Sequence, residues 1–249
     1  MHQDEVINIV ERLLASTQVE EVWNLLLETV TGFGFYHALY GFTHFHTDYG
    51  FGDDKDHFLL TNFSKDYMTG YFDEGRYRNG PIVNWALENV GTIPWSWISK
   101  NSECFSEAEK ETIEYNRTHG VVAGYTIGFH QGQRRSKAAI GLSMEPFVGT
   151  QSQADRIWKE SGRFIAMICE IAHLKIVSLP LPMKLLTPRQ REVLEWIGDG
   201  KTVLDTAMIM GLNRATVEKH LRLARDALGV DTTAQAVLKA SFHTQIYVI

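Results

Sequence analysis

The chain has 249 residues, more than the roughly 100–200 of a typical single domain, so one large or two smaller domains fit. Apolar residues make up 44%, charged residues 22% and aromatic residues 11%, an ordinary globular composition that excludes a disordered chain. The net charge of −6 is unevenly distributed, because residues 184–249 carry nine basic and seven acidic side chains and the remainder carries −8. An acidic body with a mildly basic tail predicts that one end meets a polyanion.

Cysteine usage and hydropathy narrow the cellular setting. The two cysteines, Cys104 and Cys169, cannot build a disulfide framework, and no Cys-x-x-Cys pair is present for zinc. The first residues lack the basic segment and apolar run of a signal peptide. The longest apolar stretch, residues 164–179, is interrupted by an acid, a histidine and a lysine, which excludes a simple membrane span. We therefore expect a cytoplasmic protein that makes no membrane contact.

No pattern in the chain assembles catalytic or metal chemistry. His44 and His46 lie on one face of a predicted strand, but no third ligand accompanies them. Neither Gly-x-Gly-x-x-Gly nor Gly-x-Ser-x-Gly occurs, and no nucleophile, base and oxyanion site can be grouped. We expect no catalytic residue, no metal and no cofactor.

One segment divides the chain. Pro180 and Pro182 stop a helix and hold the backbone extended, as a linker does. We predict a first domain over residues 1–177, a linker over 178–184 and a second domain over 185–249.

The first domain alternates between helical and strand-like segments. Ser106 and Glu109 form a capping box at the start of one helix. In chain order we predict a helix over 6–30, strands over 37–46 and 57–63, short helices over 66–77 and 82–88, a helix over 106–119, paired strands over 121–129 and 138–145 around a turn at 131–135, and a helix over 152–177 with Ile157, Phe164, Ile168 and Ile171 inward. Helices flanking an antiparallel sheet define an α+β fold, an α-β-α sandwich.

The tail is predicted to be all-helical, a small four-helix domain. Its helices begin at capping residues Thr187, Thr202, Asn213 and Thr232. A helix over 202–210, a break at Gly211 and a helix over 214–228 have the spacing of a helix-turn-helix.

The second helix of this pair is strongly amphipathic. Val217, Leu221, Ala224 and Leu228 form one buried stripe. The charged side chains lie opposite this stripe and are suited to enter the major groove of DNA.

Short motifs in the tail resemble the DNA-binding domain of LuxR-type regulators over nearly all of residues 185–246. They are Leu186-Thr187-Pro188-Arg189-Gln190-Arg191-Glu192-Val193-Leu194, Gly200-Lys201-Thr202, Thr216-Val217-Glu218-Lys219-His220, Leu228-Gly229-Val230 and Ala234-Gln235-Ala236-Val237. The resemblance implies groove and phosphate contacts from Thr216, Glu218, Lys219 and Arg222, and we predict that Thr202, Asn213, Arg214 and Arg225 also contact DNA.

One tail residue departs from that family. At position 218 the family usually has a basic residue, whereas this chain has Glu218. A glutamate repels phosphate but accepts a hydrogen bond from cytosine N4, so we expect an altered operator preference. The weak positive charge of the tail predicts that a homodimer on a two-fold symmetric operator supplies the second half-site.

The first domain resembles LuxR-type autoinducer-binding domains, which hold an acyl-homoserine lactone between sheet and helices. The motifs are Tyr67-Met68-Thr69-Gly70-Tyr71, Gly80-Pro81-Ile82-Val83, Ile93-Pro94-Trp95 and Gly120-Val121-Val122-Ala123-Gly124. Together with the aromatic strands they predict a ligand pocket formed by Tyr40, Phe42, Phe63, Tyr67, Tyr71, Gly80, Trp95 and Gly141.

The departures fall on the polar contacts of that pocket. Gly80 stands where the family has an Asp that receives the ligand amide, Tyr67 replaces a Trp, Phe63 a Tyr, and Gly141 a Ser or Thr. A buried amide without its acceptor costs about 1–3 kcal/mol. We therefore predict a more aromatic and less polar pocket for a small-molecule signal, either an acyl-homoserine lactone or a divergent aromatic or apolar molecule.

These features predict a ligand-responsive DNA-binding transcription regulator. Two alternatives stay open at this point. The rings could fill the pocket and leave a ligand-independent regulator, or the pocket could belong to an enzyme that carries a helical interaction module.

Overall fold

The computed structural model describes residues 3–46, 56–130, 135–180 and 186–247. Contacts divide the chain into two compact units, the first formed by residues 3–16 and 20–175 and the second mainly by residues from 176 onward. Each unit is described by itself. Most of the predicted linker, and the turn predicted at 131–135 except its last residue, lie outside the described residues.

A five-stranded antiparallel sheet forms the centre of the first unit, in the order β2-β1-β5-β4-β3. The strands are β1 (His37–Thr43), β2 (Phe58–Thr61), β3 (Gly91–Pro94), β4 (Gly124–Gly128) and β5 (Lys137–Ser143). Strands β4 and β5 pair directly, which confirms the predicted hairpin. Strand β3, paired with β4 at the sheet edge, was not predicted.

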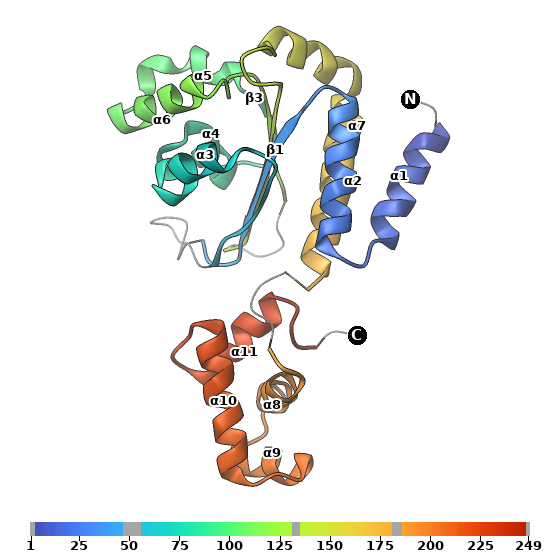
Figure 1. Cartoon of the computed structure of the whole chain (residues 1–249), viewed down its shortest axis with the longest axis vertical. Coiled ribbons are helices and arrows are strands. Elements are labelled where there is room, and N and C mark those ends of the chain that lie inside the picture. Colours follow the sequence, from blue (N-terminus) through green and yellow to red (C-terminus); the bar gives the residue numbers. More distant parts are fainter. Residues whose placement is uncertain (1–2, 47–55, 131–134, 181–185, 248–249) are drawn as a thin grey trace. The chain divides into compact units, whose positions relative to one another are not determined.

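Helices cover both faces of this sheet (Figure 1). One side carries α2 (Val19–Gly32) and α7 (Gln151–Ser178), with α1 (Gln3–Ala15) beyond α2. The other side carries α3 (Lys65–Met68), the π-helical turn η2 (Thr69–Asp73), the 3₁₀ turns η3 (Arg76–Asn79) and η4 (Ser102–Cys104), α4 (Pro81–Glu88), α5 (Ser96–Lys100) and α6 (Glu107–Thr118). The predicted α-β-α sandwich is confirmed.

Two helix predictions needed correction. The helix expected over 6–30 is interrupted at residues 16–18, where the Ser16 hydroxyl donates to the Arg12 carbonyl and ends α1. Of the four residues predicted to point inward from α7, only Ile168 is fully buried, together with Ile165 and Ile176, whereas Ile157, Phe164 and Ile171 are half-buried. A helix packed on a sheet buries only a narrow stripe of side chains. A residue one position away from the buried one, as Phe164 is from Ile165, therefore lies at the edge of that stripe.

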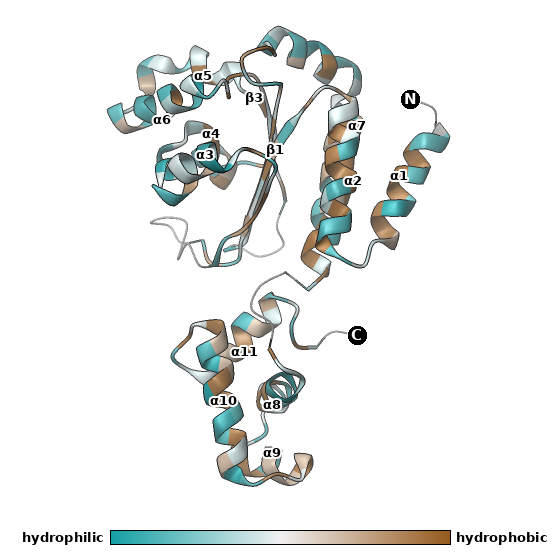
Figure 2. Ribbon diagram, viewed as in Figure 1, coloured by the Kyte–Doolittle hydropathy of each residue, from teal (hydrophilic) through white to brown (hydrophobic). Residues whose placement is uncertain are grey.

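The second unit consists of α8 (Pro188–Gly198), α9 (Val203–Met210), α10 (Arg214–Leu228) and α11 (Thr233–Phe242). Capping boxes at Thr187, Thr202 and Thr232 and an Asn213 cap begin these helices as predicted. The buried residues of α10 are the predicted Val217, Leu221, Ala224 and Leu228. Hydrophobic and hydrophilic residues alternate along α2, α7 and α10 (Figure 2). Among the described helices, none is long and apolar enough to cross a membrane.

Candidate functional sites

A cavity of about 190 Å³ lies between the sheet and the helices on the α3–α6 side. It is somewhat larger than the roughly 150 Å³ space that takes up benzene in an engineered cavity. Six of the eight predicted pocket residues line it: Phe42, Phe63, Tyr67, Tyr71, Trp95 and Gly141. The cavity can therefore hold an apolar molecule at least as large as one aromatic ring.

The floor of the cavity comes from neighbouring strands. Leu39 of β1, Gly141 of β5 and Thr126 of β4 lie in register across the sheet. The indole Nε1 of Trp95 donates to the Thr126 hydroxyl at 2.9 Å. A Cβ at Gly141 would stand 3.6 Å from both that hydroxyl and the Trp95 ring, so Gly141 leaves room on this floor. Phe42 lines one end of the cavity, and the centre of its ring also lies 6.1 Å from that of His173, which belongs to α7 on the opposite face of the sheet.

Tyr67 and Tyr71 form the adjoining wall. Their rings stack at 5.2 Å with an interplanar angle of 13°. The Tyr67 hydroxyl donates to Asn116 Oδ1 at 3.0 Å, and burial raises the pKa of Tyr67 well above its ordinary value. Tyr67 therefore lines the cavity with its ring, while its hydroxyl proton is already donated to Asn116.

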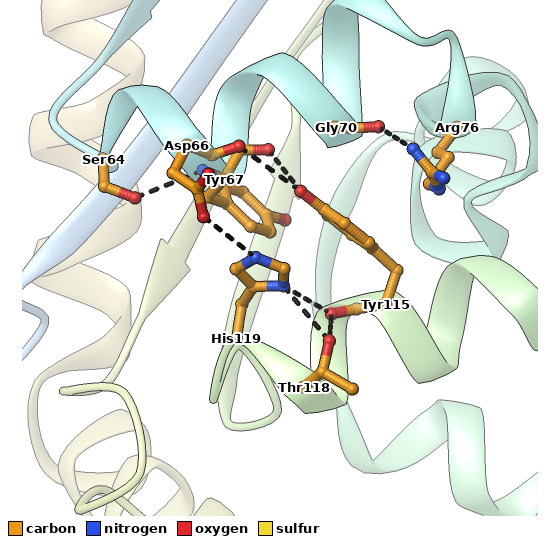
Figure 3. Close-up of polar contacts among 8 residues, drawn as sticks. All are labelled: Ser64, Asp66, Tyr67, Gly70, Arg76, Tyr115, Thr118 and His119. Carbon is orange, nitrogen blue, oxygen red and sulfur yellow. Dashed lines mark hydrogen bonds and ion pairs between the residues drawn. The ribbon is translucent and has the colours of Figure 1, made fainter.

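Contacts between α3 and α6 hold this wall from outside, with the two helices facing one another (Figure 3). The Tyr115 hydroxyl donates to the Tyr67 carbonyl at 3.0 Å, and His119 Nε2 lies 3.6 Å from a carboxylate oxygen of Asp66. Arg76 donates to the Gly70 carbonyl at 2.7 Å while its guanidinium lies 4.8 Å from the Tyr115 ring centre. These contacts fix the backbone that presents the two cavity tyrosines.

Gly80 does not line the cavity, contrary to prediction, because its surroundings are closed. A Cβ built there would lie 3.1 Å from each of three atoms: the Tyr71 hydroxyl, the Tyr77 carbonyl oxygen and a methyl carbon of Val83. Burial raises the pKa of Tyr71, so this hydroxyl stays protonated. Within the described residues the Tyr71 hydroxyl has no hydrogen-bond partner, which leaves it available to a molecule in the cavity.

The placement of Tyr40 in the pocket was wrong. Its hydroxyl hydrogen-bonds His173 Nδ1 of α7 at 2.8 Å, on the opposite face of the sheet. Side chains alternate along a strand, so Leu39 and Gly41 face the cavity while Tyr40 faces α7. Burial raises the pKa of Tyr40 and lowers that of His173 to about 4. Tyr40 is a core residue.

Sequence reasoning missed several lining residues, among them Asn116, Thr126 and Lys137. Lys137 and Gly141 are four residues apart on β5, and the two-residue period of a strand places them on one face. That signal was available in the sequence. No sequence signal brings Asn116 of α6 to the Tyr67 hydroxyl.

In the second unit, the predicted DNA-contacting residues cluster at α10 and at the start of α9. Thr202 and Asn213 cap the two helices, and Asn213 Oδ1 accepts from the Thr216 hydroxyl at 3.0 Å. Helix α9, Gly211 in the left-handed conformation and α10 form a helix-turn-helix. Its second helix presents exposed polar side chains opposite its buried stripe.

Two of the four basic residues on α10 form ion pairs within the helix. Arg214 Nε donates to Glu218 Oε1 at 2.8 Å, and Arg222 lies 3.3 Å from Asp226. Arg225 donates to the Thr233 hydroxyl at 2.9 Å. Lys219 is exposed and makes no ion pair with any described residue, so it is the cation most available to phosphate.

A cavity-bearing α-β-α domain joined to a helix-turn-helix domain defines a transcription regulator. Residues 18–176 match the autoinducer binding domain family, and residues 184–240 match the bacterial regulatory proteins of the luxR family. The chain belongs to the LuxR-type family of quorum-sensing regulators, and is not an enzyme.

Individual relatives are distant. The transcriptional activator protein AnoR of Acinetobacter nosocomialis is 21% identical over 94% of this chain and 95% of its own. The transcriptional activator protein LuxR of Aliivibrio fischeri is 23% identical over 73% and 72%. A solved structure of SdiA in complex with octanoyl-rac-glycerol has a TM-score of 0.54 at 16% identity and covers 96% of this chain and 94% of that one. This last similarity shows the fold alone.

Proposed function

We propose that the chain is a ligand-responsive transcriptional activator that binds a two-fold symmetric operator as a homodimer. The first domain spans residues 1–177 and the DNA-binding domain spans 185–249. The observation that carries the proposal is an apolar, ring-lined cavity in the same chain as a helix-turn-helix. A ligand that binds only the folded first domain stabilises it, and this linkage supplies the free energy for control of DNA binding.

The ligand in this proposal is not a standard acyl-homoserine lactone. An Asp side chain at position 80 would meet three atoms already in close contact range, and Gly80 offers no acceptor for a ligand amide. The Tyr71 hydroxyl is a neutral group that both donates and accepts. This chemistry favours an aromatic or apolar molecule with a carbonyl or hydroxyl. The SdiA complex with octanoyl-rac-glycerol supports the view that this fold accepts molecules without a lactone.

The DNA contacts proposed are the eight residues predicted from the sequence. Glu218 holds Arg214 by an ion pair, so a carboxylate and a guanidinium are presented together on the exposed face of α10. Such a pair can read a cytosine amino group and a neighbouring guanine, as carboxylates and arginines do in the major groove. The small net charge of the tail supports dimeric rather than monomeric binding.

A ligand-independent regulator is the second candidate, and one observation favours it. Phe63, Tyr67 and Tyr71 already pack against one another: the Phe63 ring lies tilted against Tyr67 at 4.9 Å between ring centres, and Tyr67 stacks on Tyr71 at 5.2 Å. A wall that is packed this way does not need a ligand in order to fold.

The test uses the full chain in two assays. Thermal unfolding is followed with acyl-homoserine lactones of several chain lengths and with octanoyl-rac-glycerol, since saturation at a hundred times Kd adds about 2.7 kcal/mol to stability. Fluorescence anisotropy then measures binding to a DNA selected from a random pool, with and without each compound.

We expect octanoyl-rac-glycerol to raise the unfolding temperature and change DNA affinity, and lactones to do neither. A shift with one lactone would refute the non-lactone assignment. Unchanged DNA affinity with every compound that binds would favour the ligand-independent candidate.

A further inference from the structure

Lys137 is the only Lys, Arg, Asp or Glu among the described residues that line the cavity. It begins β5, where it pairs with Thr43 of β1, and it shares the cavity face with Ala139 and Gly141. The other lining residues are aromatic, aliphatic or neutral polar, apart from His57, which directly precedes β2.

Among the described residues, none supplies a counter-charge to the Lys137 ammonium group. Lys137 is partly buried, and it makes no ion pair or hydrogen bond with any of the described residues through its side chain. A fully exposed cation tolerates the lack of a counter-charge because water surrounds it. Because Lys137 is partly buried beside apolar walls, an anion that a ligand brings to its ammonium is less surrounded by water than an anion at the open surface, and gains more from the contact.

The position of Lys137 also gives the cavity two chemically different ends. At one end lie Gly141, Thr126 and Trp95, with neutral hydrogen-bonding groups. Lys137 is four residues earlier on the same strand, which corresponds to about 13 Å at roughly 3.3 Å per residue. An eight-carbon chain or a ring with a short side chain has the length to run from one end towards the other.

We propose that the ligand of this cavity is an organic acid, with its apolar body among the rings and its carboxylate on the Lys137 ammonium. This inference rests on the proposed function, because it names the chemical class that the same cavity binds. The carboxylate replaces water around Lys137 with a charge-assisted hydrogen bond, the strong type of hydrogen bond. At the far end, the Thr126 hydroxyl accepts from Trp95 and can still donate to a hydroxyl or carbonyl of the ligand.

The test compares acids with their own amides. Octanoate, octanamide, trans-cinnamate and trans-cinnamamide are titrated into the full chain by isothermal calorimetry at pH 7.5. Each amide has nearly the size of its acid but carries no charge. Three variants are measured: Lys137→Gln removes the charge, Lys137→Arg keeps it, and Lys159→Gln is the matched control. Lys159 is exposed on α7, across the sheet from the cavity.

We expect at least one acid to bind ten times or more tightly than its amide to the wild type and to the Lys159→Gln variant. Lys137→Gln should reduce this ratio to about one, and Lys137→Arg should retain most of it. Circular dichroism and unchanged affinity for the amide establish that the Lys137→Gln variant is folded.

Three results would overturn the inference. They are equal binding of acids and amides, a preference for acids that persists in Lys137→Gln, and no binding of either acid. In the first case the cavity still takes a neutral ligand and the proposed function stands, with Lys137 a surface lysine only. If none of the four compounds binds and octanoyl-rac-glycerol also fails in the thermal assay, the ligand-responsive part of the proposed function fails as well.

Discussion

A methyl group added at Gly80 tests whether the cavity wall is closed at this position. The backbone there has φ −76° and ψ 113°, which any residue adopts, so Gly80→Ala changes packing without backbone strain. The new Cβ would meet the Tyr71 hydroxyl, the Tyr77 carbonyl oxygen and a Val83 methyl carbon at 3.1 Å each. One of the three is a backbone atom and cannot turn away.

The expected loss of stability is worked from two opposing effects. Overpacking of this kind costs about 1–3 kcal/mol. The loss of glycine freedom in the unfolded chain offsets about 0.4–1 kcal/mol of that cost. We therefore expect Gly80→Ala to destabilise the first unit by about 0.5–2 kcal/mol, and Gly80→Asp by more because a carboxylate is also buried.

Urea unfolding followed by tryptophan fluorescence measures this change, since five of the six tryptophans precede residue 176. Gly32→Ala is the matched control, because Gly32 is exposed at the end of α2 and a Cβ there meets nothing within 4 Å. If Gly80→Ala were as stable as Gly32→Ala, the wall would yield to a side chain, and the argument against an Asp at this position would be wrong.

Three further changes have defined outcomes. Gly141→Ala should alter the free energy of unfolding by less than about 1 kcal/mol, because the added Cβ meets only ordinary contacts at 3.6 Å. The same change should weaken the binding of cavity ligands, as measured by calorimetry, and an unchanged affinity would mean that the ligand binds elsewhere. Lys219→Ala should lower DNA affinity on all sequences and reduce the salt slope of binding by about 1, and an unchanged slope would exclude a phosphate contact. Burial lowers the pKa of His173 to about 4 in the folded protein, against about 6.5 in the unfolded chain. Below pH 6.5 the unfolded chain therefore binds a proton that the folded protein does not, and the free energy of unfolding decreases as the pH falls from 6.5 towards 4. Between pH 7.5 and 5 the loss is about 2 kcal/mol, and it should disappear from urea unfolding curves of His173→Gln; an equal loss in the variant would assign it to other groups.

Local sequence signals predicted the second unit in detail. A capping residue and its partner three positions later fix a helix start through contacts within one turn, so Thr187, Thr202 and Thr232 could be identified without tertiary information. The four-residue stripe of α10 is likewise a property of one helix. A helix-turn-helix is a short, local structure, and its sequence therefore contains most of its geometry.

The first unit depends on contacts that are distant in sequence. Strand β3 has only four residues, Gly91–Pro94, and exists because β4 pairs with it, so its own pattern carries no strand signal. Tyr40 was assigned to the pocket because it is aromatic and lies on a strand, but the period of two in β1 decides the face. Which of the two faces holds a cavity follows from the helices that cover it.

Two of the departures from the family pattern, Gly80 and Glu218, share one physical feature, which determines how they can be reversed. Gly80 lies against the Tyr71 hydroxyl, and Glu218 binds the Arg214 guanidinium. Each unusual residue therefore has a neighbour adapted to it, and residues in direct contact have non-additive effects of about 0.5–3 kcal/mol. Glu218→Lys alone would add a charge but also release Arg214 beside a new like charge, so sequence preference and affinity should change together. Gly80→Asp should be tolerated better with Tyr71→Phe than alone, since the second change removes one of the three obstructing atoms. A double-mutant cycle measures the coupling within each pair, Gly80 with Tyr71 for stability and Glu218 with Arg214 for DNA affinity. If the effects of the two single changes simply add, the two residues of that pair are not adapted to one another.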